Sequence, residues 1–61
     1  MTIKEYWNIV NNIQNAKTAE EMREKCNNAE KLIRDDSNIN NDDFDDLMMT
    51  IAYLHRESYR L

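Results

Sequence analysis

The chain has 61 residues, no glycine, no proline, one cysteine and a formal net charge of −4 at neutral pH. Glycine and proline supply the positive backbone angles and fixed turns that hairpins need, so their absence excludes most β-hairpin folds. A lone cysteine excludes an internal disulfide, whereas a secreted domain this short usually carries several cysteines. We therefore expect a single all-α domain spanning residues 1–61, located in the cytoplasm.

Two helix starts carry the same four-residue pattern. Thr2 with Glu5, and Thr18 with Glu21, both have the S/T-x-x-E form of a capping box. The first predicts a helix over about 3–16, on which Trp7 is expected to be a core residue. Its core-facing stripe comprises Ile3, Tyr6, Trp7, Ile9, Val10 and Ile13.

The second pattern predicts a helix over about 19–34, after a connection of only one or two residues. Its core stripe comprises Ala19, Met22, Cys26, Ala29 and Ile33. Small residues let helix backbones approach closely, so Cys26 and Ala29 are expected to mark the tightest helix crossing.

The third predicted helix follows a polar turn over 35–40 and spans about 41–59. Asn40 is the expected N-cap, with Ile39 and Phe44 placed as a hydrophobic staple. Its core stripe comprises Phe44, Leu47, Met48, Ile51, Leu54, His55 and Ser58. The three stripes together predict a small three-helix bundle.

Six acidic residues lie between the end of the second predicted helix and the first turns of the third. This acidic cluster comprises Asp35, Asp36, Asp42, Asp43, Asp45 and Asp46. Aspartates near a helix N-terminus favour its positive dipole end, so we interpret the cluster as capping and solvated surface. The alternative is an acidic decoy, which would imitate a phosphate backbone and occupy a nucleic-acid-binding protein.

Part of this cluster has the spacing of a calcium loop. Asp36, Asn38, Asn40 and Asp42 match positions 1, 3, 5 and 7 of an EF-hand, but the twelfth position is Leu47 instead of a bidentate glutamate. The missing carboxylate makes a divalent-ion sensor a weaker hypothesis. We expect no metal site and no cofactor.

A helix-turn-helix DNA binder and an enzyme are also weaker hypotheses. The third helix would be the reading helix, yet its first turns carry four aspartates that would approach phosphates. We therefore expect no direct nucleic-acid binding. His55 is the only histidine and Cys26 the only thiol, and both fall on core stripes. We expect no catalysis.

A second face of the third helix remains apolar. Met49 and Tyr53 lie four residues apart on the side opposite the core stripe, beside Arg56 and Arg60. Methionine, tyrosine and arginine are enriched at protein interfaces. No apolar run approaches the ~18 residues of a membrane span, so we expect no membrane partner. The sequence predicts a non-catalytic protein-interaction module, adaptor or inhibitor in type, that forms a homodimer through this face.

Overall fold

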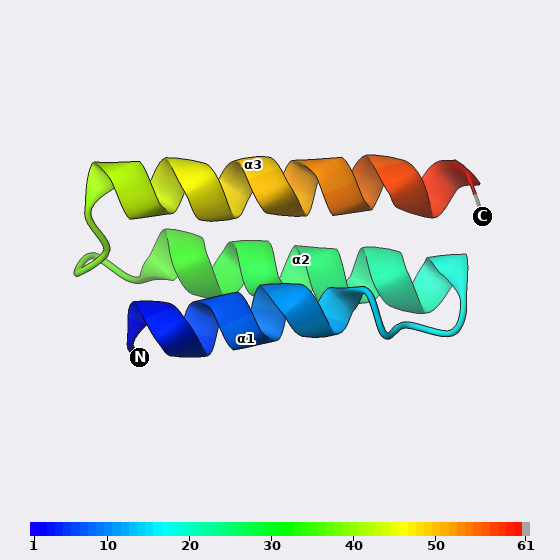
Figure 1. Ribbon diagram of the computed structural model, residues 1–61, viewed down its shortest axis with the longest axis horizontal. Coiled ribbons are helices and arrows are strands. Elements are labelled where there is room, and N and C mark those ends of the chain that lie inside the picture. Colours follow the sequence, from blue (N-terminus) through cyan, green and yellow to red (C-terminus); the bar gives the residue numbers. More distant parts are fainter. Residues whose placement is uncertain (61) are drawn as a thin grey trace.

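A computed structural model, which describes residues 1–60, confirms the all-α three-helix bundle. Helix α1 spans Ile3–Ile13, α2 spans Ala19–Asp35 and α3 spans Asn41–Glu57, followed by a short 3₁₀ helix, η1, over Ser58–Arg60. Figure 1 shows the three helices side by side, with α2 running in the opposite direction to α1 and α3. The body is elongated, with extents of 33 × 16 × 16 Å. Among the described residues, no helix is long and apolar enough to cross a lipid bilayer.

All three predicted N-caps are confirmed. Thr2 accepts a hydrogen bond from the backbone of Glu5, whose carboxylate accepts one from Thr2 in return, which completes a capping box. Asn40 accepts from the backbone N–H of Asp43. Thr18 accepts from the backbone of Glu21, but the Glu21 carboxylate accepts from the Lys17 backbone, so this second box is only half formed.

The core follows the predicted stripes of all three helices. Its fully enclosed members are Tyr6, Val10, Ile13, Met22, Cys26, Ala29, Ile33, Leu47, Ile51 and Leu54. Ile39 and Phe44, the predicted staple pair, are half-buried against this core. Trp7 is also only half-buried, because Tyr6 occupies the inward position and Trp7 lies further round the helix. Trp7, expected as a core residue, therefore packs against the core as a partly buried residue at its edge.

Helix α1 ends three residues before the predicted boundary. Backbone N–H groups at positions 14, 15 and 16 bond to carbonyls three residues back, and the Asn15 side chain donates to Asn12 at 3.0 Å. Bonds of this spacing tighten and end a helix. Residues 14–18 then connect two antiparallel helices, a longer connection than the predicted one or two residues.

A polar contact that the sequence did not reveal joins α1 to the end of α2. The Tyr6 hydroxyl donates a hydrogen bond to the Asp36 carboxylate, which also accepts from the backbone N–H of Asn38 at 2.8 Å. The hydrogen bond to Asp36, with burial, raises the pKa of Tyr6 to about 12. The bonds from Tyr6 and Asn38 hold the pKa of Asp36 below its usual value.

These shifts predict how the contact depends on pH. The folded pKa of Tyr6 lies above its unfolded value, so the stabilisation is complete below pH ~10 and is lost as the pH rises toward 12. The folded pKa of Asp36 is lowered, so the stabilisation that its carboxylate contributes is present above pH ~4 and is lost at lower pH.

The substitution Tyr6→Phe tests this pH dependence, because it removes the hydroxyl alone. The difference in melting temperature between wild type and Tyr6→Phe should be constant from about pH 6 to 9 and shrink at both extremes. A difference that grows above pH 10 would contradict this assignment.

Candidate protein-interaction surface

The outer face of α3 and η1, defined by Met49, Tyr53, Arg56 and Arg60, is exposed along its length. Met49 is 70% exposed and Tyr53 is 57% exposed. Both stand on the opposite side of α3 from Leu47, Ile51 and Leu54, the buried residues that hold the helix against the bundle. The bundle therefore leaves two large apolar side chains of one helix facing solvent.

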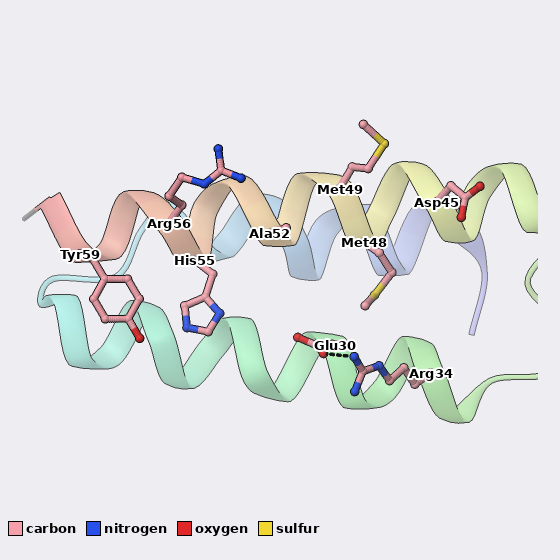
Figure 2. A pocket seen from close by; sticks show the side chains of 9 residues that line it. All are labelled: Glu30, Arg34, Asp45, Met48, Met49, Ala52, His55, Arg56 and Tyr59. Atoms are coloured by element: carbon pink, nitrogen blue, oxygen red, sulfur yellow. Dashed lines mark ion pairs between the residues drawn. The ribbon is translucent and has the colours of Figure 1, made fainter.

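Beside this face, α2 and α3 enclose an open groove of about 680 Å³. Figure 2 shows Met48, His55 and Tyr59 pointing toward α2, while Met49 and Arg56 point away from it. Met49 and Arg56 thus form the upper rim of the groove, whereas Tyr53 and Arg60 do not line it. On the α2 side of the groove, Arg34 forms an ion pair with Glu30 at 2.5 Å. A second ion pair on α2 joins Lys25 and Glu21 at 4.0 Å. The apolar surface therefore extends from the outer face toward α2.

An aromatic stack closes the C-terminal end of the groove. The rings of His55 and Tyr59 lie 5.7 Å apart at 16°, and the Arg23 guanidinium lies 4.6 Å from the centre of the Tyr59 ring. Arg23 also donates to the Ser58 carbonyl at 3.4 Å. A cation over an aromatic ring is attracted by the negative face of the ring. These contacts tie η1 to α2, and they assign His55 a packing role at the edge of the core.

Ser58 lies at the point where α3 ends and the 3₁₀ helix η1 begins. Its side chain is fully buried, as its place on the predicted stripe required, and its hydroxyl donates to the His55 carbonyl at 2.5 Å. Its backbone N–H lies within reach of several carbonyls of the last turn. The predicted helix over 41–59 therefore ends at Glu57 and continues as a 3₁₀ turn.

The acidic cluster is divided among several local roles. Asp36 receives the Tyr6 hydroxyl, and the Asp43 carboxylate accepts from the Asn40 side chain at 2.9 Å. Asp45 lines the groove. The remaining three, Asp35, Asp42 and Asp46, are exposed. Within residues 1–60, no three His, Cys, Asp or Glu side chains are grouped so that they could hold a metal ion. Two of the six aspartates, Asp36 and Asp43, therefore take part in contacts within the fold.

Cys26 lies in the core between the helices, fully buried and with a free thiol. Burial raises the pKa of this thiol, and the neighbouring Glu30 carboxylate adds to the effect. A raised pKa lowers the fraction of reactive thiolate at neutral pH. Cys26 therefore serves as a small hydrophobic residue at the centre of α2.

Comparison with known proteins found no matching family model, curated protein or solved structure.

Proposed function

We propose that this protein is a non-catalytic protein-interaction module, adaptor or inhibitor in type, whose recognition surface is the outer face of α3 and η1. The observation that carries the proposal is the 70% exposure of Met49 and the 57% exposure of Tyr53 on one face of a helix whose core is complete without them. Arg56 and Arg60 extend the same face. Large apolar side chains flanked by arginine are typical of binding surfaces.

The simplest partner is a second copy of the chain. In an isologous dimer each outer face meets its own copy, so one helix supplies both halves of the contact. Burying a methionine or tyrosine side chain contributes on the order of 1.5–3 kcal/mol, and a dimer buries two of each. The entropy cost of association offsets much of this gain, so a micromolar dissociation constant is expected.

Several features support a binding module over an enzyme. His55 packs on Tyr59 at the edge of the core, and the Cys26 thiol is buried with a raised pKa, so this thiol is not placed as an accessible nucleophile. The protein is proposed to work in the cytosol, where a lone buried cysteine stays reduced. The acidic-decoy alternative has less support, since Asp36 and Asp43 already serve contacts within the fold.

Sedimentation equilibrium tests the proposal. Wild-type protein at ~100 µM should contain dimer, and Met49→Glu/Tyr53→Glu should be monomeric, because four added carboxylates would face one another in the dimer. Both substituted positions are exposed, so helicity by far-UV circular dichroism should be retained.

A matched control distinguishes association through this face from non-specific association through any exposed apolar side chain. Leu32 is another large exposed apolar side chain, on α2 and outside the groove, so Leu32→Glu should leave the dissociation constant unchanged. A strictly monomeric wild type at this concentration would reject self-association. Equal loss of dimer in Leu32→Glu would reject the outer face as its site.

A further inference from the structure

Charge changes sign along the outer face. Six residues are placed symmetrically about Ile51. Asp42 and Asp46 lie nine and five residues before it, and Arg56 and Arg60 lie five and nine residues after it. Met49 and Tyr53 lie two residues before and two residues after it. All six side chains are exposed. Along the chain, this face is therefore acidic first, then apolar and then basic, and the apolar part is centred at the level of Ile51.

The spacing of these six residues is that of a coiled-coil seam. Successive members are separated by four, three, four, three and four residues. Residues at alternating intervals of three and four stay on one side of an α-helix, so the first five members, from Asp42 to Arg56, share one side of α3, and Arg60 follows in η1. A seam of this kind packs against a second helix along its length. In residues 1–60, α1 and α2 pack against the opposite side of α3.

We propose that the occupant of this seam is α3 of a second copy, running antiparallel about a two-fold axis level with Ile51; the inference rests on the proposed function above. In this register Asp46 faces Arg56 of the second copy, Met49 faces Tyr53, and Asp42 faces Arg60. Each contact forms twice because the interface is isologous. A parallel arrangement would instead set aspartate against aspartate and arginine against arginine, which disfavours it.

The pair formed by Asp46 and Arg56 is the better one to test. Arg60 already lies 3.5 Å from Glu57 of its own chain, so its contribution across the seam competes with an internal contact. Asp46 lies in the interior of α3, away from the capping contacts of Asn40 and Asp43. Its replacement by arginine leaves those contacts in place.

Charge reversal distinguishes the antiparallel register from every other. Asp46→Arg alone sets arginine against arginine twice in each dimer, and Arg56→Asp alone sets aspartate against aspartate twice. Each should weaken the dimer about tenfold at low ionic strength. The double variant Asp46→Arg/Arg56→Asp regains both opposite-charge pairs and should recover the wild-type dissociation constant. An equimolar mixture of the two single variants should form a heterodimer of similar strength.

For Asp46→Arg, the net charge and the proposed register predict opposite effects on association. The substitution replaces one negative charge with one positive charge and so changes the net charge from −4 to −2, which by itself lessens the repulsion between two copies. The register nevertheless predicts weaker association, because the introduced arginine would face Arg56 of the second copy. Glu24→Arg and Lys31→Asp make the same kinds of change on exposed positions of α2, and they should leave the dissociation constant within about twofold.

Sedimentation equilibrium of wild type, the single variants, the double variant and the mixture measures these outcomes, with circular dichroism as the check on folding. Weakening in both single variants and recovery in the double variant would support the register. Association that Met49→Glu/Tyr53→Glu abolishes but the charge reversals leave unchanged would overturn the register alone and leave the proposed function standing. A wild type that stays monomeric would overturn the register and reject self-association through the outer face.

Discussion

Leu47→Ala is expected to lower the free energy of unfolding by about 2–5 kcal/mol. Leu47 has no exposed surface and lies on the core side of α3, which contacts both α1 and α2. Removing its side chain loses buried apolar area and leaves a cavity that rigid neighbours fill only partly. A domain of this length has a total stability of roughly 3–9 kcal/mol, so the variant should lose a large part of it and unfold at a clearly lower urea concentration.

The matched control is Met49→Ala, two residues further along the same helix and 70% exposed. It should change the free energy of unfolding by no more than about 0.5 kcal/mol. Urea unfolding followed by Trp7 fluorescence gives both values, at ~0.05 µM protein, which is far enough below the expected micromolar dissociation constant that association contributes little. Equal losses in the two variants would mean that the inner and outer faces of α3 are assigned incorrectly.

Ala29→Leu is expected to lower the free energy of unfolding by about 1–3 kcal/mol, although leucine is larger and more hydrophobic than alanine. Ala29 is 1% exposed and Cys26, one turn earlier, is fully buried. Added methylenes in a filled interior push side chains out of their preferred rotamers or push helices apart.

Asn28→Leu places the same side chain at the neighbouring exposed position of α2, and its effect should stay within about 0.5 kcal/mol of zero. The same unfolding measurement compares the two variants. Stabilisation by Ala29→Leu would reveal unfilled space beside α2 and refute a close crossing at this position.

Much of the fold could be predicted because its signals are local. A threonine and a glutamate three residues apart report a helix start, and repeats of three and four residues report which face is buried. The end of α1 was harder to predict. Gln14 and Asn15 are compatible with a helix, but the chain needs these residues to cross from α1 to α2.

Contacts between distant residues left no such signal. Tyr6 and Asp36 are thirty residues apart, and only the arrangement of α1 beside the end of α2 brings them together. The contact of Arg23 with Tyr59 depends in the same way on the antiparallel approach of η1 to α2. Tyr6 and Trp7 fall on the same predicted stripe, and the packing of the three helices buries Tyr6 while leaving Trp7 at the edge of the core.

The candidate surface was predictable in part for the same reason. The exposed positions of Met49 and Tyr53 follow from helix periodicity once the core stripe of α3 is identified. The groove beside them requires the lateral placement of α2 against α3, which periodicity does not supply. Met48, His55 and Tyr59 could therefore be identified as groove-lining residues only from the packing of α2 against α3 (Figure 2).

If the outer face of α3 binds a second copy of the chain, amide NMR spectra of wild type should change as the protein concentration rises from ~10 µM to ~500 µM. We expect concentration-dependent shifts centred on Met49, Tyr53 and Arg56, with none at Asn8 and Asn12 on the solvent side of α1. Spectra that do not change over this range, or shifts centred on α1, would contradict it.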